Sequence, residues 1–435
     1  MARKRPYAPL RVLLNNHLVG HLSKEPGGGI AFRYAESWLA RERGIPVSLS
    51  LPLRDDAYSG APVTAFFENL LPDSEALRRR VAEKVGADGT DCYSLLSRIG
   101  RDCVGALQFM PEGDDVAGDT TRIEGQPVSD REIEKLLNNL AQAPLGLDQD
   151  QDFRISVAGA QEKTALLFHA GKWWKPHGTT PTTHLFKTSL GRLPNGLDLS
   201  NSVENEFYCL KLMAAFGLPV NAVKMRRFGK TRALVIERFD RRWTEDGRLL
   251  RIPQEDCCQA LSIPPTRKYQ SEGGPGMTDI LTLLKGSDTP AADQKQFLKA
   301  QILCWLMGAT DGHAKNFSLF LGPGGRFYMT PIYDVLTAQP SLEARQILKK
   351  QMKLAMFVGD SRHYRMDYIQ GRHFIQTAVK AGLPTALAQE VLVDVAEHAE
   401  AALTAVEQQL PSGFPEEIHA SVQRGFTERL ARIEY

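Results

Sequence analysis

The chain has 435 residues, with 53 Lys and Arg against 51 Asp and Glu, 43% hydrophobic residues and 24% charged residues. This is the composition of a globular protein, and its length predicts two or more structural units with sizeable cores. A net charge of only +2 excludes a protein that is basic as a whole, so any contact with nucleic acid must come from a local patch.

The amino-terminal stretch MARKRP is basic, but no apolar segment follows it. The longest apolar run, residues 297–309, is interrupted by Lys299 and Gln301, which argues against a membrane span. We therefore expect a cytoplasmic protein with neither a signal peptide nor a membrane partner. The six cysteines form no C-x-x-C pair, which indicates reduced thiols rather than a zinc site.

The first hundred residues have the pattern of a small β-rich unit. In RVLLNNHLVGHLS, Asn15 and Asn16 separate two apolar runs, which predicts a hairpin. A helix is predicted from about 74 to 85, with Asp73 or Ser74 as its N-cap and Gly86 at its end. Residues 111–127 are rich in Gly, Asp and Thr, and this composition predicts a loop or linker.

From about residue 153 the pattern changes to short strands separated by turns. Strands are expected at 153–157, 163–169, 173–176, 183–189, 222–228 and 231–240. The last two are joined by Gly229 and Lys230, which again indicates a hairpin. After about residue 255 helical periodicity dominates. In that part helices are expected at 277–286, 291–308 and over most of 372–408. One further helix is expected earlier, at 200–216.

The stretch GATDGHAKNFS, residues 308–318, follows an apolar helix and carries several polar residues. Asp311 and Asn316 have the Asp-x-x-x-x-Asn spacing of a protein-kinase catalytic loop. In such a loop the carboxylate accepts the proton of an attacking hydroxyl, and the carboxamide oxygen binds the metal of the nucleotide. A plain polar turn after a helix that stops at Gly308 is the alternative interpretation.

Two further residues have the types and positions that a kinase needs. RFYMTPIYDVL is typical of a strand that ends at Asp334, where a second carboxylate holds magnesium between the phosphates. THLFK places Lys187 at the end of an apolar run, as in kinases that pair a lysine with the phosphates, and Glu206 is a candidate to orient it. Taken singly, Asp334 also suits a turn or helix cap, and Lys187 a solvated surface position.

Two more segments suit nucleotide binding. In ALVIERFDRRW, the backbone of residues 237–239 is placed to meet an adenine edge, although a β-edge with a solvated arginine cluster fits equally well. ISVAGAQEKTALL carries Gly159 among small residues, so its backbone N–H groups are suited to wrap phosphate oxygens. It is not a Walker A loop, because Glu162 precedes Lys163 and Val157 stands where the first glycine should be.

Taken together, these segments resemble the HipA family, the serine/threonine kinase toxins of bacterial toxin–antitoxin pairs. The resemblance rests on SVAGAQEKTALL, PTTHLFK, VIERFDRRW, PQEDCCQAL, KYQSEGGPG, GATDGHAKNFS and PIYDV, which occur in the family order. It implies an α+β fold of the two-lobe protein-kinase type. The expected parts are an extra β-rich subdomain over 1–145, a mixed α/β lobe over 146–255 and an all-helical lobe over 256–435.

The resemblance also assigns roles to residues. Asp311 would be the catalytic base, Asn316 and Asp334 the magnesium ligands, and Ser156 a site of autophosphorylation that switches the enzyme off. The residues expected to bind ATP are Ala158, Gly159, Ala160, Gln161, Glu162, Lys163, Lys187, Glu237, Arg238, Phe239, His313, Asn316, Tyr333 and Asp334.

The function implied by the resemblance is that of an ATP- and magnesium-dependent protein kinase toxin. It would phosphorylate a translation-related protein of the aminoacyl-tRNA synthetase class and promote dormancy or drug tolerance. A HipB-like helix-turn-helix antitoxin would be its partner, and the pair would bind operator DNA and repress their operon. Direct DNA contacts would be few, such as Arg78 to Arg80, which otherwise form a solvated helix face. A corepressor with a vestigial kinase site and a small-molecule kinase remain as alternatives.

Overall fold

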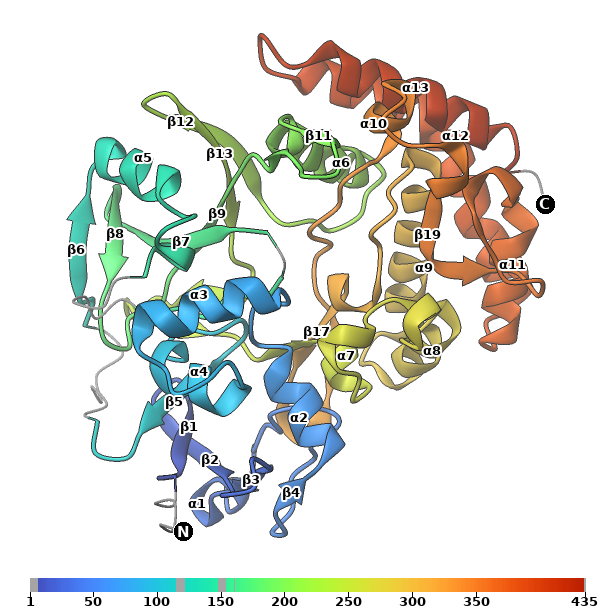
Figure 1. The fold of residues 1–435 in the computed structure, drawn as a ribbon. Helices are drawn as coiled ribbons and strands as arrows, with labels where there is room; N and C mark the ends of the chain where they lie inside the picture. The colour runs from blue at the N-terminus through green and yellow to red at the C-terminus, as the bar shows by residue number, and fades with distance from the viewer. Residues whose placement is uncertain (1–6, 115–121, 148–153, 160, 434–435) are drawn as a thin grey trace. The chain divides into compact units, whose positions relative to one another are not determined.

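Figure 1 shows the computed structural model, which describes residues 7–114, 122–147, 154–159 and 161–433. The chain divides into two compact units, each made of discontinuous segments. Unit 1 comprises Met1–Thr188, Arg226–Thr266 and Leu319–Arg326, and unit 2 comprises Ser189–Met225, Arg267–Ser318 and Phe327–Tyr435. The three-part division expected from the sequence stays a prediction.

Unit 1 begins with a five-stranded antiparallel sheet in the order β4-β3-β2-β1-β5. Its strands are β1 (Leu10–Leu14), β2 (His17–Lys24), β3 (Ile30–Tyr34), β4 (Tyr58–Ser59) and β5 (Leu107–Pro111). Asn15 and Asn16 both have positive φ angles, 46° and 67°, as a two-residue hairpin turn requires. The predicted hairpin is therefore confirmed.

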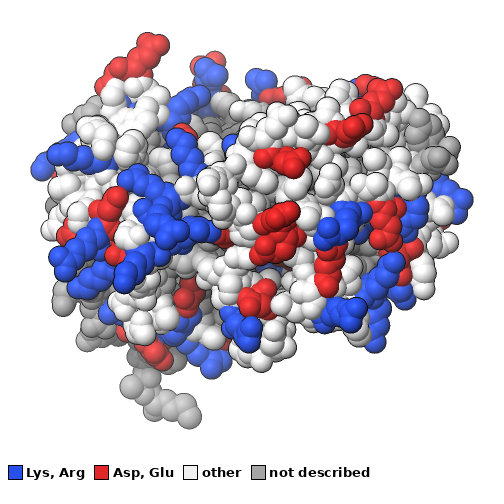
Figure 2. All heavy atoms as spheres, turned by 90° about the horizontal axis from the view of Figure 1, so that it is seen from above, with Lys and Arg blue, Asp and Glu red and all other residues white. Residues whose placement is uncertain are grey.

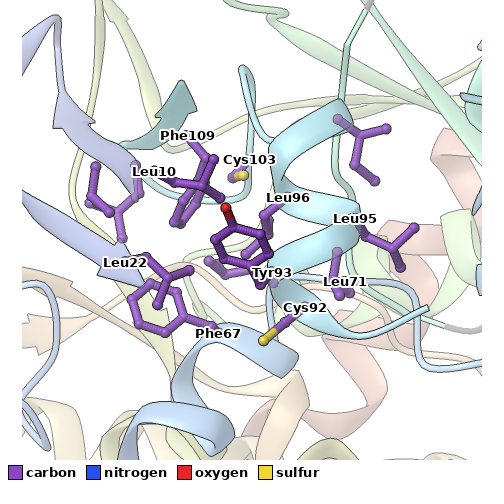
Figure 3. Close-up of a cluster of buried hydrophobic side chains, with 14 of the residues drawn as sticks. Leu10, Leu22, Phe67, Leu71, Cys92, Tyr93, Leu95, Leu96, Cys103 and Phe109 are labelled. Atoms are coloured by element: carbon purple, nitrogen blue, oxygen red, sulfur yellow. The ribbon is translucent and has the colours of Figure 1, made fainter. Parts of the chain in front are cut away.

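Four helices accompany this sheet: α1 (Glu36–Leu39), α2 (Ala61–Glu68), α3 (Glu75–Val85) and α4 (Cys92–Ile99). The Ser74 side chain caps α3 by accepting a hydrogen bond from the Leu77 N–H, and Gly86 ends the helix with a φ of 63°. Figure 3 shows the apolar core, in which Leu22 and Phe109 of the sheet lie near Phe67 of α2. This core accounts for the amphipathic strands and helices of the first hundred residues.

The second sheet of unit 1 has the strand order β12-β13-β9-β7-β8-β6. Its strands are β6 (Gly125–Val128), β7 (Lys163–His169), β8 (Lys172–Pro176), β9 (His184–Thr188), β12 (Val223–Phe228) and β13 (Thr231–Glu237). Helix α5 (Asp130–Asn138) begins with a capping box between Ser129 and Glu132 and buries Ile133 and Leu137 against this sheet. The remaining elements are β14 (Arg241–Trp243), β15 (Leu249–Arg251), β16 (Gln254–Asp256) and α7 (Cys257–Ala260).

Two expectations for this region are wrong. Residues 125–127, expected to lie in a linker, form most of β6 because they pair with β8. Of the strand expected over 153–157, residue 153 lies outside the described residues. Residues 154–157 form only an isolated bridge between Ile155 and Asp102, in which the Ser156 N–H donates to the Asp102 carbonyl.

Unit 2 is built around α9 (Pro290–Met307), whose side chains are buried on almost every side. It contacts α6, α8, α11, α12 and α13 within this unit. A helix that is apolar all round belongs in a protein interior, which explains the run FLKAQILCWLM. The helices of this unit are α6 (Ser202–Ala215), α8 (Met277–Leu283), α9, α10 (Gln339–Glu343), α11 (Gly371–Lys380), α12 (Thr385–Gln409) and α13 (Glu416–Leu430).

The part expected to be entirely helical also contains short strands. They are β17 (Ser318–Leu321), β18 (Phe327–Met329), β19 (Lys353–Val358) and β20 (His363–Arg365), and β10 (Gly191–Arg192) pairs with β11 (Asp198–Leu199) earlier in the chain. The helical structure expected over most of 372–408 is confirmed as two helices, and Gly382 with a φ of 83° and Pro384 separate α11 from α12.

Single-turn 3₁₀ helices lie at Pro144–Gly146, Pro265–Arg267, Gln270–Glu272, Leu284–Gly286, Ala314–Asn316, Pro323–Gly325, Lys349–Gln351 and Met366–Tyr368. The cysteines, Cys92, Cys103, Cys209, Cys257, Cys258 and Cys304, are buried free thiols, as predicted. Of the helices in the described part of the chain, none is both long and apolar enough to cross a membrane.

Candidate active site

The loop GATDGHAKNFS begins where α9 ends. Gly308 has a φ of 76°, a left-handed conformation that favours glycine at the end of a helix. The Ala309 N–H then donates to the Cys304 carbonyl at 2.8 Å, which closes the helix end. A buried helix therefore anchors the start of this loop.

Asn316 holds the loop together. Its Nδ2 donates to the Asp311 carbonyl oxygen at 2.8 Å and to the Asp334 carbonyl oxygen at 3.3 Å. The His313 N–H also donates to the Asp311 carbonyl, at 2.8 Å. The Asp311 side chain itself is 53% exposed. The structure thus brings together Asp311, Asn316 and Asp334, while the Asp311 carboxylate stays open to a ligand.

Asp334 has a left-handed backbone with a φ of 57°. Such a conformation is costly for a residue with a Cβ and is found where surrounding contacts impose it. Here Tyr333 supplies those contacts, because its hydroxyl lies 2.6 Å from Ser318 Oγ and donates to the Lys315 carbonyl at 2.9 Å. The segment that carries Asp334 is therefore held against the loop that carries Asp311.

The prediction that Asp334 ends a strand is wrong. Strand β18 stops at Met329, and beyond it only Ile332 forms an isolated bridge, to Val220. Pro331 has no N–H to donate to a ladder, and the positive φ of Asp334 is incompatible with an extended strand.

These residues line one recess of unit 2. Its polar lining comes from Asp311, Asn316, Tyr333 and Asp334, and its apolar lining includes Met213 and Cys304. Among the described residues, no group of three or more His, Cys, Asp or Glu side chains forms a metal cage. Magnesium does not require one, because it is bound by one or two protein oxygens together with substrate phosphates. The Asp334 carboxylate and the Asn316 carboxamide oxygen fit that donor set.

In unit 1, the segment around Ser156 and Gly159 is attached to the β-rich part of the same unit. Ser156 is fully buried, and its Oγ donates to the Leu70 carbonyl at 2.8 Å. The Asp73 N–H donates to the Gly159 carbonyl at 3.2 Å, and Gly159 forms a bridge with Pro72. Gly159 has a φ of 106°, and a Cβ there would lie 2.6 Å from Lys163 Nζ. Ala160 lies outside the described residues.

The rest of this segment makes polar contacts within unit 1. Lys163 Nζ donates to the Ala158 carbonyl at 2.8 Å, and Gln161 Nε2 donates to the Thr188 carbonyl at 2.9 Å. Glu162 pairs with Arg80 at 2.7 Å. Lys163 also lies directly opposite Lys187 on the neighbouring strand, and both side chains are buried. Two buried ammonium groups on one face of a sheet form a site suited to phosphates.

The segment from Glu237 to Phe239 begins at the last residue of β13. Glu237 is exposed, whereas Arg238 is buried and donates its backbone N–H to the Thr183 carbonyl at 2.9 Å. Phe239 packs edge-on against Phe320 with ring centroids 5.5 Å apart. The alternative of a solvated arginine cluster is wrong for Arg238 and Arg241, whose side chains are 3% and 2% exposed.

Asp102 explains why these arginines are buried. Its carboxylate accepts hydrogen bonds from Arg241 at 2.8 Å, from Arg251 at 3.1 Å and from the Thr182 hydroxyl at 2.7 Å. Arg238 lies 3.3 Å from the same carboxylate. Burial alone would raise the pKa of Asp102, but the surrounding arginines hold it well below its usual range.

Sequence reasoning missed three contributors to the site. Asp102 carried no local signal, because its partners lie far away in the sequence. Arg80 was interpreted with its neighbours as a helix face or DNA contact, and Arg78 is in fact buried against Glu68. Tyr269 lies in the segment KYQSEGGPG, and its hydroxyl donates to Asp311 Oδ1. Glu206 is buried in α6, and its pairing with Lys187 stays a prediction.

Comparisons with known proteins identify the family. A model described as HipA-like C-terminal domain matches residues 155–403, and one described as HipA N-terminal domain matches residues 10–110. The first alone covers more than half of the chain. The chain belongs to the HipA family. Its match to both models agrees with the family motifs found along the whole sequence.

Relatives extend over most of the chain. The putative kinase Y4mE of Sinorhizobium fredii is 37% identical over 81% of this chain and 83% of its own length. The serine/threonine-protein kinase toxin HipA of Shewanella oneidensis is 27% identical over 98% of this chain and 95% of its own. The expected enzyme class, a serine/threonine protein kinase, is thereby confirmed at the level of the family.

A solved structure also matches nearly end to end. It is the complex of HipA, HipB and operator DNA from Shewanella oneidensis, with a TM-score of 0.79 and 27% identity, and the match covers 98% of this chain and 96% of that chain. This similarity confirms the predicted α+β, kinase-like fold of the HipA family.

Proposed function

We propose that this chain is a toxin of the HipA type that transfers the γ-phosphoryl group of ATP to a serine or threonine of a protein. The observation that carries the proposal is the placement of Asn316, whose amide group links the backbones of Asp311 and Asp334 in one recess. Catalysis of phosphoryl transfer depends on positioning and charge stabilisation, so a fixed arrangement of these groups is what the reaction needs.

Asp311 would act on the acceptor hydroxyl. Its exposed carboxylate is free to accept the hydroxyl proton while the oxygen attacks the γ-phosphorus and ADP leaves with the electrons of the broken bond. Asn316 and Asp334 would hold magnesium, which when bound neutralises charge on the phosphates. The buried pair Lys163 and Lys187 would add positive charge at the phosphates, and the backbone of residues 237–239 would bind the adenine.

Ser156 would regulate the enzyme through autophosphorylation. A phosphate adds almost two negative charges, and neither its charge nor its volume suits the fully buried position of Ser156 Oγ beside the Leu70 carbonyl. Phosphorylation therefore requires the segment to leave this position. We expect mass spectrometry to find phosphate on Ser156 in the wild type and none there in Asp311→Gln. An equal occupancy in Asp311→Gln would show that another kinase modifies Ser156.

The partners would be a HipB-like helix-turn-helix antitoxin and, mainly through it, operator DNA, with repression of the shared operon. This part of the proposal is supported by the HipA, HipB and operator DNA complex that matches the chain. Figure 2 shows a face on which Lys and Arg gather toward the left and both signs of charge mix elsewhere, as a protein with local contacts would have. Arg78 is excluded as a DNA contact by its buried pairing with Glu68.

The protein substrate would belong to the aminoacyl-tRNA synthetase class. Incubation of a cell lysate with labelled ATP and the wild type should label a synthetase, and Asp311→Gln should not label it. Labelling of a small hydroxylated acceptor with no labelled protein would favour a small-molecule kinase. Operator binding with the antitoxin but no phosphate transfer of any kind would favour a corepressor with a vestigial site.

A further inference from the structure

The family segment KYQSEGGPG has no role in the account above, yet it reaches the catalytic loop within unit 2. The Tyr269 hydroxyl donates to Asp311 Oδ1. The Tyr269 ring packs edge-on against His313, with centroids 4.9 Å apart and an interplanar angle of 84°. A tyrosine 42 positions earlier in the chain is thus in direct contact with the expected catalytic base.

The glycines of this segment explain how Tyr269 is placed. The N–H groups of Glu272 and Gly274 both donate to the Tyr269 carbonyl at 3.0 Å. A Cβ on Gly274 would lie 2.0 Å from the Arg267 carbonyl oxygen, so the turn can close only around glycine. Gln270 then fastens the turn by accepting the Phe357 N–H at 2.9 Å. The backbone that carries Tyr269 is therefore fixed from both sides.

Both neighbours of the Asp311 carboxylate approach the same oxygen. His313 Nε2 lies 3.7 Å from Oδ1, the atom that also accepts the Tyr269 hydroxyl. The His313 ring is buried and forms a wall against which the Tyr269 ring packs edge-on. Both contacts are therefore made to Oδ1 and not to the second carboxylate oxygen, Oδ2.

We propose that Tyr269 is a positioning residue for Asp311, an inference that rests on the kinase function proposed above. Its hydroxyl fixes the rotation of the carboxylate through Oδ1 and leaves Oδ2 to accept the hydrogen bond of the acceptor hydroxyl. A carboxylate held in one rotation presents its lone pairs to the acceptor without first losing conformational freedom. KYQSEGGPG is the segment that builds this support.

The test uses Tyr269→Phe, which removes one hydroxyl and keeps the ring against His313. Because a hydrogen bond to a charged group is lost at a partly exposed site, kcat for phosphate transfer should fall roughly 10-fold, with the KM for ATP unchanged within about twofold. Tyr368→Phe is the matched control, because Tyr368 is 57% exposed in the same unit. It should leave both constants unchanged.

A double-mutant comparison distinguishes a positioning role of Tyr269 from a general folding defect. If Tyr269 acts through Asp311, then Tyr269→Phe should cause no further loss in the residual activity of Asp311→Asn. A folding defect would lower activity in both backgrounds and would overturn the inference, as would an unchanged kcat in the single variant. A rise in kcat would also overturn it, because it would mean that the hydroxyl blocks the base. A folded wild type that binds ATP but transfers no phosphate would instead refute the proposed function itself.

Discussion

Lys163 and Lys187 face each other directly across the antiparallel strands β7 and β9, and both side chains are buried. Like charges in opposed positions of a sheet repel, and the repulsion is stronger where water is excluded. An arrangement of this kind is stabilised by an anion between the two groups. It is the feature of unit 1 that most directly suits the phosphates of a nucleotide.

Replacement of Lys187 by Met should therefore weaken ATP binding without harming the fold. The dissociation constant for ATP, measured by calorimetry, should rise roughly 10-fold or more because a charge-assisted contact is lost. Circular dichroism should show that the variant is folded. Lys172→Met, at an exposed position of β8, is the control and should bind ATP normally. Equal affinities for Lys187→Met and the control would mean that Lys187 does not contact the phosphates.

Gly159→Ala should reduce phosphate transfer by disturbing the segment around Gly159, without unfolding the protein. Alanine at a φ of 106° is strained, and its Cβ would collide with Lys163 Nζ. We expect a loss of phosphate transfer of roughly 10-fold or more, with an unfolding free energy reduced by only about 1–3 kcal/mol. Gly171→Ala is the control, because Gly171 also has a positive φ, 75°, but open space around it, so this variant should retain activity. Similar activity in the two variants would contradict the role of Gly159.

Asp102→Asn should destabilise unit 1, because it leaves Arg238, Arg241 and Arg251 buried with less opposing charge. Breaking a buried ion pair costs about 3–5 kcal/mol, which chemical denaturation can measure. Because the pKa of Asp102 is depressed in the folded state, its stabilisation is present above about pH 4 and is lost as pH falls. Asp246→Asn, at an exposed pair with Arg248, should cost less than about 1 kcal/mol. Equal losses would show that the network contributes little.

Glu255 should make the protein less stable as the pH rises from about 4.5 to about 8. Burial raises its pKa to about 8, although the Leu49 N–H and the Ser48 hydroxyl both donate to the carboxyl group. A raised pKa means that the folded state holds the proton more tightly, so this stabilisation is complete below about pH 4.5 and is lost as pH rises toward 8. The slope should approach about 1.4 kcal/mol per pH unit and be absent in Glu255→Gln. Parallel stability profiles for the two proteins would contradict this assignment.

Much of the fold follows from local sequence patterns. The Asn15–Asn16 hairpin, the Ser74-capped helix and the hairpin at Gly229–Lys230 depend on residues a few positions apart, and the structure confirms each of them. The burial of α9 also follows, because its apolar residues occupy every face. Local propensity and burial pattern agree in these elements, so no tertiary information was needed.

The parts that could not be predicted depend on contacts between distant residues. The Asp102 network joins positions up to 149 residues apart, and the contact of Tyr269 with Asp311 spans 42. The alternation of apolar residues before Asp334 predicts a strand that ends there. In the structure, contacts from Tyr333 and Asn316 instead hold Asp334 in a left-handed turn. The spacing of Asp311 and Asn316 indicated the catalytic loop, but only the fold shows that Asn316 also reaches Asp334.

The central claim is that Asp311 is the base of an ATP-dependent protein kinase. The most direct measurement is the rate at which purified protein transfers the γ-phosphate of labelled ATP to protein, for the wild type, Asp311→Gln and the exposed control Asp360→Asn. The account predicts transfer by the wild type and the control, and a loss of roughly 100-fold or more in Asp311→Gln, which should still fold and bind ATP. Undiminished transfer by Asp311→Gln would contradict the account.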